Sequence, residues 1–93
     1  MQLDQLIHNE LRLRIMTTLL SVEEADFNYL RQVTGATAGN LSSHLDTLAK
    51  ALYITIEKGF VGRRTRTTAR LTPTGRQALT TYIDALTKII HPE

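Results

Sequence analysis

The chain has 93 residues, which suffice for one compact core, and we expect residues 1–93 to form a single domain without a large catalytic cleft. It contains no cysteine, which excludes disulfides and thiolate metal sites and favours a reducing, cytoplasmic location. No stretch approaches the roughly 18 apolar residues of a membrane span, so we expect no membrane contact. The net charge of +2 is unevenly spread, because residues 53–93 carry seven basic and three acidic groups and residues 1–52 carry four and six.

Apolar residues every fourth position predict a first helix over residues 9–20. Asp26 has a short acceptor side chain suited to capping a second, short helix, in which Phe27, Leu30 and Val33 should face inward.

A third helix should follow a tight turn at residues 34–37. Gly35 can take the left-handed conformation that ends a helix, and Thr37 can cap the next one. The third helix is predicted over residues 37–51, with a narrow buried stripe formed by Leu41, Leu45, Leu48 and Leu52. Two helices joined by a glycine-containing turn form a helix-turn-helix.

From Tyr53 the hydrophobic period changes to two, which predicts a β-hairpin with a glycine-containing tip over residues 60–64. On its second strand Arg64, Arg66 and Arg70 share one face, whereas Ala69 and Leu71 share the other and should cover the core.

Thr72 and Pro73 predict the start of a long last helix over residues 72–92. Its apolar stripe is longer than a small core needs, and Leu3, Leu6 and Ile7 have no obvious place in that core. Both ends of the chain should therefore meet a second copy across a two-fold axis. The expected dimer interface comprises Leu3, Leu6, Leu79, Tyr82, Ile83, Leu86 and Ile90.

The predicted class is mainly α with a small β-hairpin (α+β). The element order, together with the stretches at residues 12–16, 39–45 and 71–76, resembles small single-domain winged helix-turn-helix transcriptional regulators of the MarR and ArsR type. The resemblance implies a three-helix core, a wing over residues 57–70 and a C-terminal dimerisation helix. It also implies that the helix over residues 37–51 enters the major groove.

The helical wheel independently places small or polar side chains opposite the leucine stripe, where they could reach phosphates or base edges. The predicted DNA-binding residues are Thr37, Gly39, Asn40, Ser42, Ser43 and His44 from this helix and Arg63, Arg64 and Arg66 from the wing. Wing arginines can also serve only to keep a hairpin edge soluble. If each wing of a dimer neutralises about three phosphates, log K against log salt should have a slope near −5.

We expect neither catalysis nor a cofactor, because no nucleophile–base pair and no phosphate-binding loop can be found. Asp84, His91 and Glu93 are metal-ligand types without a recognised spacing, so we predict no metal site. The resulting hypothesis is a homodimeric, sequence-specific repressor that binds an inverted-repeat operator in double-stranded DNA, with half-sites about one helical turn apart. An effector ligand is unknown. The alternative is a winged helix that serves as a protein–protein interaction module without DNA binding.

Overall fold

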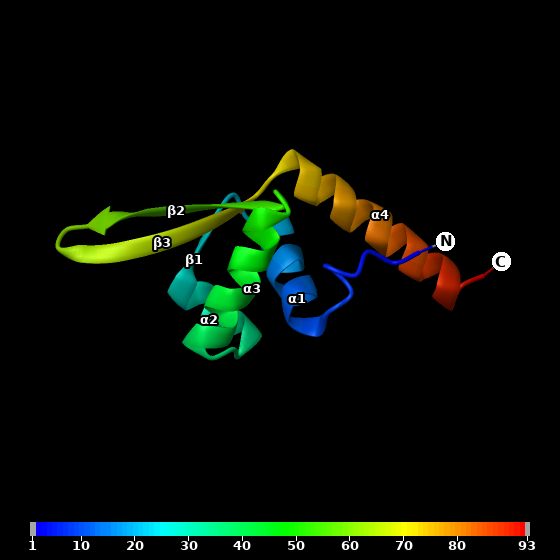
Figure 1. Cartoon of the computed structure of the whole chain (residues 1–93), viewed down its shortest axis with the longest axis horizontal. Coiled ribbons are helices and arrows are strands. Elements are labelled where there is room, and N and C mark those ends of the chain that lie inside the picture. Colours follow the sequence, from blue (N-terminus) through cyan, green and yellow to red (C-terminus); the bar gives the residue numbers. More distant parts are fainter. Residues whose placement is uncertain (1, 93) are drawn as a thin grey trace.

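The computed structural model describes residues 2–92 as four helices and a three-stranded antiparallel sheet. The helices are α1 (Glu10–Leu20), α2 (Phe27–Thr34), α3 (Ala38–Lys50) and α4 (Pro73–Ile90), and the strands are β1 (Ala25–Asp26), β2 (Ile54–Val61) and β3 (Arg64–Leu71). The β2–β3 hairpin and α4 extend from the α1–α3 body toward opposite ends of the molecule (Figure 1). The predicted α+β winged helix-turn-helix architecture is confirmed.

Each helix begins at a side-chain cap. Asn9, Asp26, Thr37 and Thr72 each accept a hydrogen bond from the backbone N–H three residues later, and the last three were predicted as caps. Gly35 ends α2 in the left-handed conformation, with φ 71°, as predicted. These local signals fix the helix-turn-helix geometry.

Leu52 corrects the predicted buried stripe of α3. The helix ends at Lys50, and Leu52 lies beyond it with 69% of its surface exposed and φ 65°. Its N–H donates to the Ala49 carbonyl oxygen at 3.0 Å, while Tyr53 N–H donates to the Leu48 carbonyl oxygen at 3.0 Å. These two bonds form a Schellman motif, whose left-handed position usually holds glycine.

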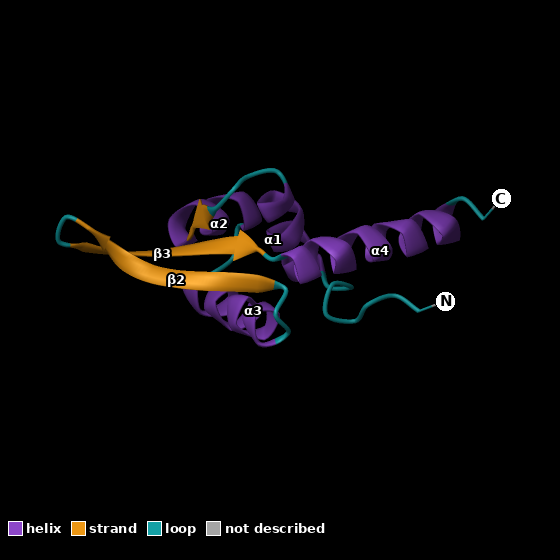
Figure 2. Cartoon of the chain, turned by 90° about the horizontal axis from the view of Figure 1, so that it is seen from above, coloured by secondary structure: helices purple, strands orange, loops and turns teal. Residues whose placement is uncertain are grey.

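The sheet has the order β1-β3-β2, and its first strand was not predicted. Ala25 pairs with Ala69, and Asp26 pairs with Thr68. Figure 2 shows β2 and β3 side by side along the hairpin. The hairpin tip is also shorter than predicted, because Val61 still pairs with Arg64 and only residues 62–63 form the turn. The wing is therefore a regular two-stranded ribbon almost to its end.

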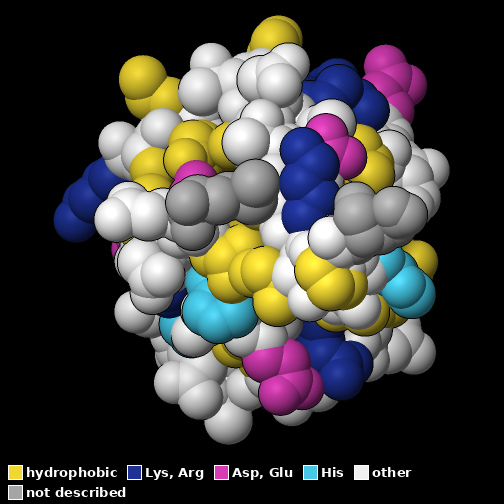
Figure 3. All heavy atoms as spheres, turned by 90° about the vertical axis from the view of Figure 1, so that its right-hand side faces the viewer, with side chains coloured by type: hydrophobic (Ala, Val, Ile, Leu, Met, Phe, Trp, Pro, Cys, Tyr) yellow, Lys and Arg dark blue, Asp and Glu magenta, His cyan; other side chains and the backbone are white. Residues whose placement is uncertain are grey.

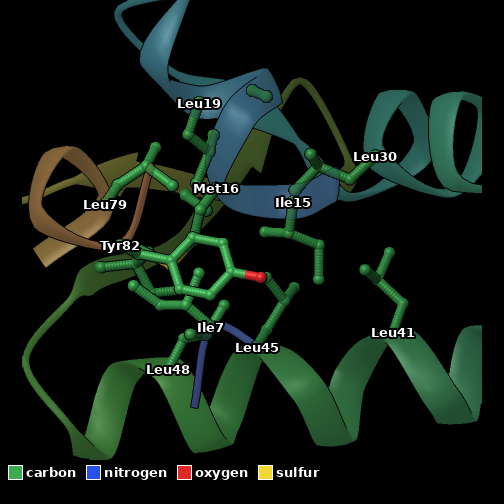
Figure 4. Packing of buried hydrophobic residues seen from close by; sticks show 13 residues of the cluster. Ile7, Ile15, Met16, Leu19, Leu30, Leu41, Leu45, Leu48, Leu79 and Tyr82 are labelled. Atoms are coloured by element: carbon green, nitrogen blue, oxygen red, sulfur yellow. The ribbon is translucent and has the colours of Figure 1, made fainter. Parts of the chain in front are cut away.

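One hydrophobic cluster lies between the three-helix body, the sheet and the start of α4 (Figure 4). Leu30, Leu41, Leu45 and Leu48 are buried as predicted, but Val33 is exposed rather than inward. Leu79 and Tyr82, which were assigned from sequence to the dimer interface, are instead core residues, and so is Ile7, for which the sequence indicated no place in the core.

The N-terminal segment is held against the body by polar contacts. The Asp4 carboxylate accepts from Leu6 N–H and from the Tyr53 hydroxyl, and His8 Nδ1 lies 2.9 Å from the Tyr82 hydroxyl oxygen. The Asp4 hydrogen bond and burial raise the pKa of Tyr53 to about 12. Residues 4–8 therefore belong to the folded unit.

The last helix starts against the first residues of β2. Thr72 N–H donates to the Tyr53 carbonyl oxygen at 3.0 Å, and Thr72 Oγ1 donates to the Leu52 carbonyl oxygen at 2.6 Å. A Cβ atom at Gly75 would overlap the same Tyr53 carbonyl, so the approach of α4 requires glycine at this position.

Candidate nucleic-acid interface

The exposed face of α3 carries small and polar side chains. Thr37, Gly39, Asn40, Ser42 and Ser43 are all exposed, opposite the buried leucines of the same helix. Thr37 Oγ1 accepts from Asn40 N–H at 3.2 Å, and nothing lies within 4 Å of a Cβ built on Gly39. The N-terminal half of α3 is thus open to close approach by a large partner.

His44 is the member of the predicted set that is turned toward α1. It is half-buried, and its Nδ1 lies 2.9 Å from Arg12 Nη1, whose guanidinium also donates through Nε to the Leu6 carbonyl oxygen. Since arginine only donates, the His44 ring is neutral with its proton on Nε2. Burial and the Arg12 charge lower the pKa of His44 below 6.5.

The two faces of the hairpin differ in chemistry. Direct pairing of Arg70 with Thr55 and of Arg66 with Gly59 puts the arginines on the face opposite Ile54 and Ile56, as the sequence predicted. The face that turns toward α3 continues from Ile56 to Lys58. With Phe27, Ser42, Leu45, Asp46 and Thr67, these two residues line a hollow of about 120 Å³ between α2, α3 and the sheet.

Two of the wing arginines are paired with acidic residues near β1. Arg66 Nε lies 3.7 Å from Asp26 Oδ2, and Arg70 Nη2 lies 2.6 Å from Glu24 Oε1. Arg63 and Arg64 are exposed at the tip. No carboxylate of residues 2–92 lies within ion-pair distance of either of them or of Lys58.

Among the basic residues of the hairpin, Arg63 and Arg64 at the tip and Lys58 on the α3 side therefore have no ion-pair partner within residues 2–92. Lys58 is not among the DNA-binding residues that the sequence predicted. Its parity with Ile54 and Ile56 was the signal that could have identified it, because residues two apart on a strand share a face.

A second exposed surface lies at the opposite end of the molecule, on α4. Ile83, Ile89 and Ile90 are exposed, whereas Leu86, Leu3 and Leu6 are half-buried. Figure 3 faces this end and shows hydrophobic side chains near the middle of the view.

Among the described residues, no three His, Asp or Glu side chains lie close enough together to hold a metal ion. Glu93, one of the three ligand types considered from sequence, lies outside the described residues. In the same residues, no helix combines the length and the apolar character that a membrane crossing needs.

Comparison with known proteins defines the class. The sequence model of the winged helix DNA-binding domain matches residues 11–90, and the chain belongs to this family. It is 30% identical over 79 residues to the uncharacterised protein MJ0432 of Methanocaldococcus jannaschii. The aligned region covers 85% of this chain and 86% of that protein.

Solved structures agree with the family. A transcriptional regulator homologue from Pyrococcus horikoshii is 28% identical, with a TM-score of 0.88 over 96% of this chain and 88% of that chain. A MarR family transcriptional regulator from Silicibacter pomeroyi shares the fold at 22% identity and a TM-score of 0.69, over 86% of this chain and 52% of that chain. The resemblance to winged helix-turn-helix regulators is confirmed, and family and fold together support a DNA-binding regulator.

Proposed function

We propose that the protein is a homodimeric transcriptional regulator that recognises an inverted repeat in double-stranded DNA and represses by occupying promoter DNA. In this proposal α3 enters the major groove and the β2–β3 hairpin is the wing. We also propose that the protein acts in the cytoplasm.

One observation carries the DNA-binding part. A helix face of small polar side chains lies on the same side of the molecule as Lys58, and the hairpin that carries Lys58 ends in a protruding tip with exposed Arg63 and Arg64. Small side chains and an open Gly39 allow the α3 backbone to approach base edges, while the cations can neutralise phosphates. The likeness to the transcriptional regulator homologue from Pyrococcus horikoshii supports the regulatory role.

The homodimer part rests on the exposed apolar face of α4. Ile83 and Ile90 are seven residues apart and therefore share one side of the helix, and the half-buried Leu86 lies between them. Leu3 and Leu6 remain candidates for the same interface, whereas the buried Leu79 and Tyr82 can support it only from beneath. Residues 72–92 keep their proposed role as the dimerisation helix.

The test starts with selection from a pool of random duplexes by the purified protein. We expect an inverted repeat with half-sites about one helical turn apart and affinity that falls steeply with salt. Ser42→Ala with Ser43→Ala should reduce discrimination among duplexes, since base contacts carry specificity. Weak binding without sequence preference would contradict the proposal and favour a protein–protein interaction module.

The dimer is tested by sedimentation of the variant Ile83→Glu with Ile90→Glu. These charges should yield a monomer with unchanged helix content, because both side chains are exposed in the single chain. A dimer that persists in this variant would contradict the proposed α4 interface.

A further inference from the structure

The tip of the wing presents two large apolar side chains to solvent. Phe60 is 75% exposed and Val61 is 59% exposed. The chain has only two phenylalanines, and the other, Phe27, packs against the core. At this exposure the Phe60 side chain contributes little burial to the fold, so it is available to contact a partner.

The strand register sets the direction in which each of these side chains leaves the hairpin. Phe60 pairs with Thr65 and shares the face of Ile56 and Lys58, which turns toward α3. Val61 pairs with Arg64 on the opposite face. Phe60 is therefore on the side from which α3 would meet a duplex.

The charge around the tip defines what the partner must be. Residues 58–66 contain Lys58, Arg63, Arg64 and Arg66 and no acidic residue. Glu24 and Glu57 line a hollow with Phe60 and Arg66 along the hairpin, so the positive charge is concentrated at the tip and at Lys58. A partner that combines negative charge with an apolar interior able to accept an aromatic ring fits this tip. Duplex DNA has both properties, because stacked bases lie between two rows of phosphates.

We propose that Phe60 is a wedge that enters the minor groove beside the α3 site and partly unstacks one base step. Arg63 and Arg64, which are at the same tip, hold nearby phosphates. Pyrimidine–purine steps such as TA and CA are the easiest to unstack, so Phe60 selects such a step at the wing position without a hydrogen bond to a base. The inference rests on the proposed function and adds a specificity-determining residue to it.

The experiment uses the full chain and a duplex selected by the wild-type protein, with 2-aminopurine placed in turn at each position of the wing flank. Unstacking raises the fluorescence of this base. Wild-type protein should raise it at one step, and Phe60→Ala should abolish the rise. The affinity of Phe60→Ala should fall about tenfold on a duplex with TA at that step and much less where the step is GC.

Three variants serve as matched controls. Val61→Ala truncates the neighbouring exposed side chain on the other face and should keep the signal and the preference. Phe60→Leu should retain part of both, because leucine can also act as a wedge. Arg63→Ala should weaken binding to the TA and GC duplexes equally, because phosphate contacts are independent of sequence.

The outcomes separate this inference from the proposed function. Specific binding in which Phe60→Ala matches wild type in affinity and fluorescence overturns the wedge alone. Absence of specific duplex binding by the wild type overturns the proposed function and the wedge with it. Loss of binding to anionic lipid vesicles in Phe60→Ala, with DNA binding unchanged, identifies a membrane surface as the partner and also overturns the wedge.

Discussion

Asp26 joins the wing to the first helix of the helix-turn-helix. Its Oδ1 accepts from Tyr29 N–H at 2.7 Å at the start of α2, and its Oδ2 lies 3.7 Å from Arg66 Nε on β3. Arg66 is therefore partly neutralised within the protein, unlike Arg63 and Arg64 at the tip. This relationship changes the expected number of phosphate contacts per wing from three to two.

The first prediction concerns salt dependence. The double variant Arg63→Ala with Arg64→Ala should flatten the slope of log K against log salt by about 3 to 4 units in a dimer, because each lost phosphate contact removes about 0.9. Arg66→Ala should flatten it by less than about 1 unit. Binding isotherms at four or more salt concentrations measure both slopes. If Arg66→Ala and Arg64→Ala flatten the salt-dependence slope equally, the ion pair with Asp26 does not keep Arg66 from contacting a phosphate.

The second prediction compares two glycines. Gly75→Ala should lower the free energy of unfolding by about 3 kcal/mol, since the added methyl group meets the rigid Tyr53 carbonyl. Gly39→Ala has open space around it and should leave the free energy of unfolding unchanged or raise it by up to about 1 kcal/mol.

Urea denaturation measures both changes. Gly39→Ala should nevertheless weaken specific DNA binding, because its methyl group stands on the face of α3 that approaches the bases. A stable Gly75→Ala variant would mean that α4 can be displaced from β2 at little cost.

The third prediction concerns the residues that follow α2 and α3. Gly35 and Leu52 have the same left-handed backbone conformation but different side chains. Leu52→Gly should raise the free energy of unfolding by about 1 kcal/mol, because glycine removes the steric cost of φ 65° and the exposed side chain has little burial to lose. Gly35→Leu, the reverse change at φ 71°, should lower it by about 1–2 kcal/mol. Destabilisation by Leu52→Gly would indicate that the Leu52 side chain makes a stabilising contact.

The fourth prediction is a pH dependence of stability that arises from His44. Its pKa in the folded protein lies below that of the unfolded chain, so above about pH 6.5 the residue is neutral in both states and its contribution is complete. As the pH falls below 6.5 the unfolded chain takes up the proton first, and stability decreases until the folded-state pKa is passed.

Titration of the His44 ring by NMR should give a midpoint below 6.5. Arg12→Met should move this midpoint upward, because it removes the neighbouring charge and the donor to Nδ1. A wild-type midpoint at or above 6.5 would contradict the assignment, and so would an unchanged midpoint in Arg12→Met.

Signals that act over a few residues made most of the fold predictable. The caps at Asp26, Thr37 and Thr72 and the left-handed Gly35 all lie where the sequence placed them. The alternation on β3 also assigned the arginines to the correct face. Leu52 was misplaced because its spacing continues the leucine stripe beyond the point where the helix ends.

Features that depend on distant partners could not be predicted in the same way. The two residues of β1 are too few to show a period, and their pairing with β3 joins positions more than 40 residues apart. The acidic partners of Arg66 and Arg70 are equally remote in sequence. The arginines of β3 therefore lie on the predicted face, but ion pairs that the sequence did not reveal reduce the positive charge that the wing presents.

Ile7 has a practical consequence for anyone who trims the chain. The family match begins at residue 11, yet the Ile7 side chain is completely buried and residues 4–8 contact Tyr53 and Tyr82. A fragment cut at the family boundary would leave an empty space of isoleucine size under α4 and two tyrosine hydroxyls without their partners. The smallest autonomous unit is therefore longer than the matched domain, and affinity tags are better separated from Asp4 by a spacer.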